Sequence, residues 1–400
     1  MCCSTTPKTK AASPAVKDSS AVKKPPALPP IQSLQKFLND AYSVHKANLE
    51  PSSTNLNGFT LTSTEAAISI RMIESDGNQQ YAGINDTKMY YSGSLVKVAA
   101  IYAAFDLRAA ARKHAADVSF TADPAFFASL NTAIDTSTAT PRLITFGKGL
   151  HPEWAKIFKG HKPAGTNQVS FTDTFRADLI KIGDNPNAAR VIRALGYSYI
   201  NVSLKKGNFF DEPSLNGIWL AGDYTGEGTE IAGGIKSVRI PVVNDNVPGG
   251  SAQAISTKKM SELFYLLHIE KAYQHVSDAT ERSLANVGPH SILQSEGSFF
   301  FDARPTPFIQ LTEPRNFTNH CAKVGIGTLG PIGTPGPSVI SEGDVMSWTD
   351  AAAVTNFNTK YNRKLTGDFA ICWQNMYKPH SRFDALVKLI NTTIKDFLAQ

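Results

Sequence analysis

The stretch YSGSLVKVAAIYAAFDLR, residues 91 to 108, decides how the rest of the sequence is interpreted. From Leu95 onward its side chains leave almost no polar face, which predicts a helix buried in the protein interior. Lys97 nevertheless falls in the first turn of that helix. A cation there faces the positive end of the helix dipole, and a lysine is seldom buried without a partner. The position of Lys97 therefore needs an explanation.

Ser94 supplies one explanation, because it lies three residues before Lys97 and shares a helix face with it. A neutral lysine can take the proton of a serine hydroxyl, and the free N–H groups of a helix start favour negative charge nearby. The Ser-x-x-Lys pattern occurs six times, but only the match at Ser94 opens a strongly apolar helix, the others starting at Ser20, Ser33, Ser43, Ser203 and Ser256. The competing interpretation is a helix-capping serine followed by a lysine that snorkels to solvent.

Length and composition indicate a globular protein with a large core, since the chain has 400 residues and is 42% hydrophobic. No apolar run is long enough to cross a bilayer, and the first 30 residues hold none long enough for a secretory signal. We therefore expect either a cytoplasmic chain or one whose export signal is missing from this version. Residues 1–30 hold five lysines, one aspartate and six prolines, so we expect a disordered tail. The functional alternative is a tether that holds the domain near a cell wall or membrane surface. Without this tail the formal charge falls from +6 to +2, and nucleic-acid binding is poorly supported.

Cysteine and histidine spacing predicts no metal site, because no Cys-x-x-Cys or His-Glu-x-x-His pattern is present, and the serine hydrolase chemistry considered below needs no cofactor. Cys321 and Cys372 fall on the first and third of the last three expected strands. If these three strands lie side by side in chain order, as the family resemblance given below implies, one strand separates the two thiols by about 10 Å, beyond the reach of a disulfide. We therefore predict two free, buried thiols.

The order of periodic segments predicts an α+β (αβα) fold. An antiparallel sheet is assembled from N- and C-terminal parts and flanked by helices, and a mostly helical lobe is inserted between them. The α/β part is expected at 31–92 and 316–400 and the lobe at 93–315, within one domain spanning 31–400. Strands are expected at 66–74, 81–84, 320–329, 341–350 and 368–376, with an extra strand pair at 237–243. Helices are expected at 31–50, 173–195, 252–285 and 381–398.

Three further motifs follow Ser94 in order: GDNPNAA at 183–189, EPSLN at 212–216 and KVG at 323–325. Together with YSGSLVK they resemble the Ser-x-x-Lys, Ser-Asp-Asn, Glu-Pro-x-Leu-Asn and Lys-Thr-Gly motifs of class A serine β-lactamases and their penicillin-recognising relatives. The resemblance covers residues 31–400. Longer spacings than usual imply insertions around 115–170 and 225–315.

The resemblance implies a role for each matching residue. Ser94 would be the acylated nucleophile and Lys97 its proton acceptor, while the N–H groups of Ser94 and Ile326 would form the oxyanion hole. Lys323 would add positive potential, and Asn185 would bind Lys97 and a substrate amide. The water that hydrolyses the acyl-enzyme would be held by Glu212 and Asn216. The implied catalytic residues are Ser94, Lys97, Glu212 and Lys323, and the implied substrate-binding residues are Asn185, Asn216, Gly325 and Ile326.

Two departures weaken the expectation of efficient penicillin hydrolysis. Gly183 replaces the serine of Ser-Asp-Asn and Val324 replaces the threonine of Lys-Thr-Gly, which removes two hydroxyls that help to bind a substrate carboxylate in the family. Each lost contact is worth roughly 1 to 3 kcal/mol. A further route known on this fold uses Tyr-x-Asn, which Tyr199 and Asn201 would supply.

Three functions remain open at this point. The first is a serine hydrolase that acts on β-lactams or related amides and esters. The second is a peptidoglycan peptidase or esterase in which Glu212 plays no part, and the third is a non-catalytic binding module of the same fold. The resemblance implies a monomer with a small-molecule or peptidoglycan-like substrate, in a periplasmic or secreted setting.

Overall fold

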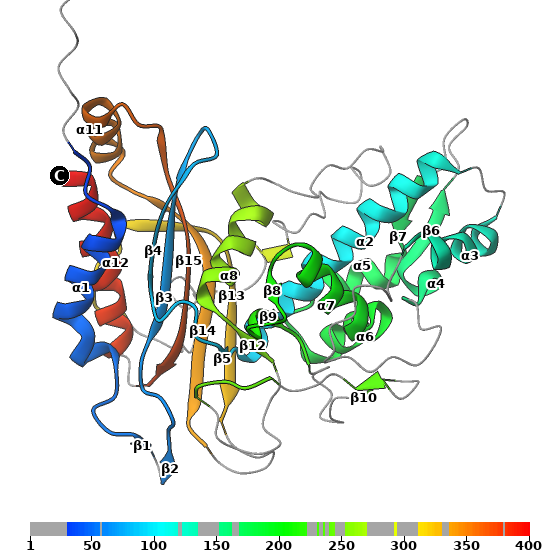
Figure 1. The fold of residues 1–400 in the computed structure, drawn as a ribbon, viewed down its shortest axis with the longest axis horizontal. Helices are drawn as coiled ribbons and strands as arrows, with labels where there is room; N and C mark the ends of the chain where they lie inside the picture. Colours follow the sequence, from blue (N-terminus) through cyan, green and yellow to red (C-terminus); the bar gives the residue numbers. More distant parts are fainter. Residues whose placement is uncertain are drawn as a thin grey trace, which may run out of the picture.

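The computed structural model describes residues 30–56, 58–118, 122–134, 152–161, 168–221, 230–231, 235–236, 240–244, 253–269, 292–293, 311–329, 336–378 and 381–400 (Figure 1). The tail expected at 1–30 lies outside these residues except for Pro30. A helix was expected at 252–285, and its part after residue 269 also lies outside the described residues.

A five-stranded antiparallel sheet forms the centre of the α/β part, with strand order β13-β14-β15-β3-β4. Its N-terminal strands pair with a C-terminal one, since Ile70 lies opposite Ile371 in register. The antiparallel sheet and its flanking helices confirm the predicted α+β class. The strands are β3 (Ala67–Glu74), β4 (Gln79–Ile84), β13 (Phe317–Thr328), β14 (Ser338–Trp348) and β15 (Leu365–Tyr377).

Helices α1 (Leu34–Leu49), α11 (Ala351–Tyr361) and α12 (Ser381–Ala399) share a hydrophobic core with one face of this sheet. Helices α1 and α12 run side by side (Figure 1). The backbone N–H of Gln32 donates to Oε1 of Gln400 over 2.7 Å, so the start of α1 meets the end of α12. Sequence periodicity missed α11, whose first turn is capped by Asp350.

The other sheet face packs on α8 (Thr257–Phe264), which continues as the π-helical turn η2 (Tyr265–Ile269). The alternation predicted for β3 is present, but its polar face is buried as well. Ser69 Oγ donates to the Thr257 carbonyl over 2.7 Å, and Arg71 Nε donates to Ser261 Oγ over 3.0 Å. Satisfied hydrogen bonds allow both polar side chains to lie under the helix.

A mostly helical lobe surrounds α2 (Lys97–Asp117), as Figure 1 shows. Its other helices and strands are α3 (Asp123–Ala133), α4 (Trp154–Ile157), β6 (Phe158–His161), β7 (Gln168–Phe171), α5 (Asp173–Ile180), α6 (Asn185–Leu195) and α7 (Tyr197–Lys206). Among the described helices, none is long and apolar enough to cross a membrane.

Two sequence predictions in this lobe were wrong. The helix expected at 173–195 is two helices, because α5 ends at Ile180 and α6 begins at Asn185. Gly183 and Pro186 explain the break, since glycine favours turns and proline is favoured in the first turn of a helix, where its missing N–H leaves no bond unmade. The strand pair expected at 237–243 is not formed by residues 240–243, and the remainder lies outside the described residues.

A smaller four-stranded sheet, of order β5-β12-β9-β8, lies where the two parts meet. It consists of β5 (Tyr90–Tyr91), β12 (Ala254–Ile255), β9 (Asn216–Trp219) and β8 (Phe210–Asp211). The chain passes from β5 into the one-turn helix η1 (Gly93–Val96) and then into α2. Two further strand pairs are β1 (Asn55–Leu56) with β2 (Phe59–Thr60), and β10 (Glu230–Ile231) with β11 (Ile235–Lys236).

Candidate active site

Ser94 lies in η1, half-buried, and Lys97 is the first residue of α2. The Lys97 side chain has no exposed surface. The snorkelling interpretation is therefore wrong, because the amine does not reach solvent.

The Lys97 amine donates two hydrogen bonds to the turn between α5 and α6. Its Nζ lies 2.7 Å from the carbonyl oxygen of Gly183 and 2.8 Å from Oδ1 of Asn185. These two oxygens offset the cost of placing an amine at the positive end of a helix. Asn185 was expected from its motif, whereas the Gly183 carbonyl was missed because a backbone acceptor leaves no mark in the sequence.

This turn is held in place by an ion pair between its flanking helices. Arg190 on α6 donates from Nε and Nη2 to the two carboxylate oxygens of Asp178 on α5, over 2.9 and 2.6 Å. A paired arginine and carboxylate add geometric precision to a contact. The two acceptors of Lys97 therefore lie in a turn whose flanking helices are joined by this ion pair.

Strand β13 packs directly against η1, backbone against backbone. A Cβ added to Gly325 would lie 2.1 Å from the Ser92 carbonyl oxygen, and one added to Gly93 would lie 2.7 Å from the Ile326 carbonyl carbon. Gly93 also has φ of 52°, in the left-handed region that glycine tolerates best. The two backbone segments assigned to the oxyanion hole are therefore in contact because both carry a glycine at the crossing.

Lys323 shares its strand face with Gly325, since side chains two residues apart on a strand point the same way. It is 5% exposed, and its Nζ donates to the Val324 carbonyl over 3.0 Å. Val324 packs on the opposite face, with the core under α12. Ile326 is 39% exposed, and its backbone is the part that meets Gly93 of η1.

Glu212 and Asn216 lie at the tip of the β8–β9 hairpin. Glu212 Oε2 pairs with Lys205 Nζ on α7 over 2.7 Å, and the Asn216 amide donates to the Thr87 carbonyl. Through Ala254 of β12, Trp219 lies level with Tyr91. The hairpin tip therefore extends toward Thr87, at the opposite end of β5 from Ser94.

The Tyr-x-Asn pair has contacts of a structural kind. Tyr199 is 5% exposed and donates its hydroxyl to Asp106 over 2.8 Å. The Asn201 amide is fully buried and bonds both the N–H and the carbonyl of Leu220, over 3.1 and 2.8 Å. Tyr199 thus joins α7 to α2, and Asn201 joins α7 to the end of β9.

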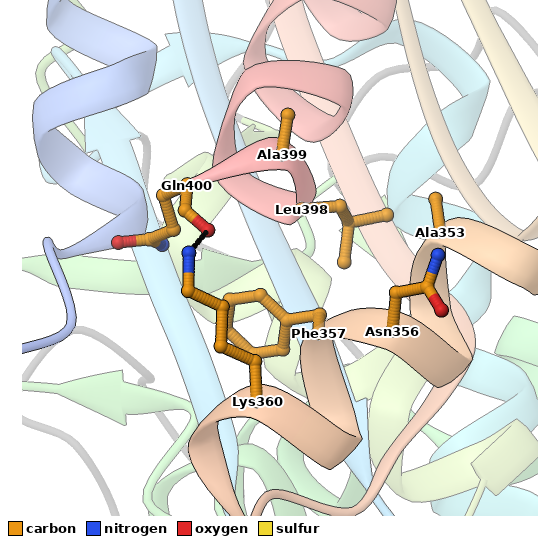
Figure 2. A pocket seen from close by; sticks show the side chains of 7 residues that line it. All are labelled: Ala353, Asn356, Phe357, Lys360, Leu398, Ala399 and Gln400. Carbon is orange, nitrogen blue, oxygen red and sulfur yellow. Dashed lines mark hydrogen bonds between the residues drawn. The ribbon is translucent and has the colours of Figure 1, made fainter. Parts of the chain in front are cut away.

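A surface pocket lies on the other side of the large sheet from Ser94, between α11 and α12 (Figure 2). Lys360 donates there to the Gln400 carbonyl over 2.5 Å. In the described part of the chain, no three histidine, cysteine or acidic side chains are grouped to hold a metal ion.

No family model matches the sequence, and no curated protein matches it. Solved structures do align along most of the chain. A β-lactamase from Chitinophaga pinensis covers 91% of this chain and 98% of its own at 9% identity, with a TM-score of 0.43. A β-lactamase from Sphaerobacter thermophilus covers 92% and 98% at 12% identity, with a TM-score of 0.40, and a class D enzyme from Fusobacterium nucleatum covers 90% and 97% at 10% identity, with a TM-score of 0.36.

The topology of the chain itself is that of the α+β fold expected from the order of its segments. Terminal helices and α11 cover one face of a sheet built from both ends of the chain, α8 covers the other, and a helical lobe follows the first strands. The Ser-x-x-Lys segment begins the central helix of that lobe, facing the edge strand β13. The predicted α+β layout, with a sheet from both ends of the chain and a helical lobe between them, is confirmed in this arrangement.

Proposed function

We propose that the protein is a serine acyl-transfer enzyme of β-lactamase-like fold. Its nucleophile is Ser94 and its substrates are amide or ester carbonyls, with β-lactams the leading class. The observation that carries this proposal is the fully buried Lys97 amine, held by two oxygens one helical turn after a half-buried serine. A lysine is placed in an apolar helix start at a cost, and proton transfer explains why that cost is tolerated.

The proposed chemistry uses the Lys97 amine in its neutral form. A neutral lysine amine has two N–H bonds, which Gly183 and Asn185 accept, and one lone pair. The lone pair takes the hydroxyl proton as the Ser94 oxygen bonds to the substrate carbonyl carbon. The resulting oxyanion is stabilised by the N–H groups of Ser94 and Ile326. When the carbonyl re-forms, the C–N or C–O bond breaks and the leaving atom takes the proton back from Lys97.

A second candidate concerns the hydrolysis of the acyl-enzyme. The pairing of Glu212 with Lys205 at a hairpin tip favours an enzyme in which Glu212 does not activate the hydrolytic water. Such an enzyme acylates readily and releases its product slowly, as a penicillin-binding peptidase or esterase would. Gly183 and Val324 point the same way, because neither side chain offers a hydroxyl to a substrate carboxylate.

Intact mass followed over time after mixing with a simple penicillin tests the proposal. We expect a mass increase equal to the penicillin in the wild type and none in Ser94→Ala. The matched control is Ser43→Ala, which alters an exposed Ser-x-x-Lys pattern on α1. Absence of an adduct in the wild type at every time point would instead support a non-catalytic binding module. The setting that accompanies this function is extracytoplasmic, with a monomer acting on a small-molecule or peptidoglycan-like substrate.

A further inference from the structure

Ser341 connects the nucleophile segment to the sheet through a buried hydroxyl. It lies on β14, opposite Gly325 in register, and is 2% exposed. Its Oγ donates to the Ser92 carbonyl over 2.9 Å, and the Gly325 carbonyl oxygen lies 3.4 Å from the same hydroxyl. One side chain on β14 therefore contacts both η1 and β13.

The hydroxyl reaches η1 only because Gly325 has no side chain. A Cβ at that position would lie 2.7 Å from Ser341 Oγ and 2.7 Å from the Leu95 nitrogen. The Ser92 carbonyl also accepts the Leu95 N–H over 3.1 Å, which closes the turn that contains Ser94. Ser341 thus bonds to the carbonyl oxygen that defines the geometry of this turn.

We propose that Ser341 is a positioning residue for acylation at Ser94, an inference that rests on the proposed function. The two N–H groups assigned to the oxyanion hole belong to η1 and β13, which are distant in sequence. From strand β14, Ser341 contacts both segments and so fixes the distance between η1 and β13. Oxyanion donors contribute only when they lie about 2.7 to 3.1 Å from the developing charge, so a small drift between the segments reduces the rate.

The test compares Ser341→Ala and Ser341→Cys with the wild type. The control is Ser347→Ala on the same strand, where Ser347 bonds to His320 and Asp368. Six residues of strand place Ser347 about 20 Å from Ser341. We expect the penicillin acylation rate constant to fall about 10- to 100-fold in Ser341→Ala, with reversible binding before acylation unchanged. Cysteine is a weaker donor of similar shape and is expected to give an intermediate rate.

An acylation rate in Ser341→Ala equal to that of the wild type or of Ser347→Ala would overturn the inference. A loss of reversible binding with an unchanged acylation rate would overturn it too.

Hydrogen exchange separates this inference from the proposed function, because it requires no reaction. In Ser341→Ala, we expect faster exchange in the peptides containing residues 92–96 and 324–327, and in Ser347→Ala no change there. If the wild type forms no adduct, the proposed function fails. The exchange pattern would then still support the hydrogen bond by which Ser341 holds η1 in place. Unchanged exchange in Ser341→Ala would show that Ser341 does not hold η1 and β13 in place.

Discussion

Lys97 shows how a single residue carries information that composition does not. Its amine is completely buried, yet a carbonyl and an amide oxygen accept its hydrogen bonds at 2.7 and 2.8 Å. Removing such a group leaves two buried acceptors without their donor, which is costly in a low-dielectric interior. The position is therefore specified by a local network and by the chemistry proposed for it.

The two buried thiols give a prediction at this scale. Cys321 and Cys372 have no exposed surface and are unpaired, with β14 between their strands, as predicted. Burial raises the pKa of both thiols well above its usual value. Because only the thiolate reacts, we expect iodoacetamide at pH 8 to leave both unmodified in the native protein and to modify both in denaturant. Peptide mapping measures this, and a Cys321–Cys372 disulfide peptide would contradict it.

At the scale of elements, the crossing of η1 and β13 depends on absent side chains. Gly325→Ala would place a Cβ 2.1 Å from the Ser92 carbonyl oxygen, so one backbone segment must move. We expect a loss of about 1 to 3 kcal/mol in the free energy of unfolding and a strong loss of penicillin acylation. Chemical denaturation and intact mass measure the two effects.

Gly77→Ala is the control for Gly325→Ala. Gly77 has φ of 86°, and a Cβ added there would meet nothing within 4 Å, so this variant introduces backbone strain without crowding. It is expected to lose about 1 kcal/mol and to be acylated normally. Equal acylation of the two variants would show that the approach of β13 to η1 does not matter for the reaction.

Helix α12 gives a prediction about pH. Partial burial opposes ionisation of Asp384, but hydrogen bonds from Thr312 and Glu313 hold the pKa of this carboxyl below its usual value near 3.8. The native state therefore binds fewer protons than the unfolded state just below pH 3.8, and stability falls as the pH falls through the lowered pKa. We expect Asp384→Asn to lose stability at pH 7 and to lose less on acidification than the wild type. Thermal melts from pH 6 to pH 3 test this, and parallel curves for the two proteins would contradict it.

At the scale of the whole molecule, the relative placement of the small sheet and the nucleophile decides which chemistry is available. The hairpin that carries Glu212 points along β5 away from Ser94, and Lys205 pairs with its carboxylate. The Glu212 carboxylate is thus paired with a lysine of α7, and its implied role toward the hydrolytic water stays a prediction.

Glu212→Gln tests this placement. We expect the lifetime of the acyl adduct to stay within about twofold of the wild type, because general-base catalysis typically contributes 10²- to 10⁴-fold when it operates. Lys205→Met breaks the same ion pair from its other side and serves as the matched control. A lifetime lengthened at least 100-fold in Glu212→Gln alone would assign the hydrolytic base to Glu212.

The sequence alone determined the class of fold and the segment that contains the candidate nucleophile. Strand alternation, the terminal helix periods and Ser-x-x-Lys at the start of an apolar helix are local patterns, and each depends on residues within one or two turns. The family resemblance of the motifs added Asn185 and the strand order that separates Cys321 from Cys372 by one strand.

Only the tertiary structure decided what surrounds that nucleophile. The Gly183 carbonyl on Lys97, the crossing of Gly93 and Gly325, and the reach of Ser341 to Ser92 join residues from separate parts of the chain. Backbone acceptors and missing Cβ atoms have no signature in a sequence, because any residue supplies a carbonyl and a glycine serves many turns. The position of Glu212 was likewise set by strand register in the small sheet, which pairs strands from three separate parts of the chain and has no local signature in the sequence.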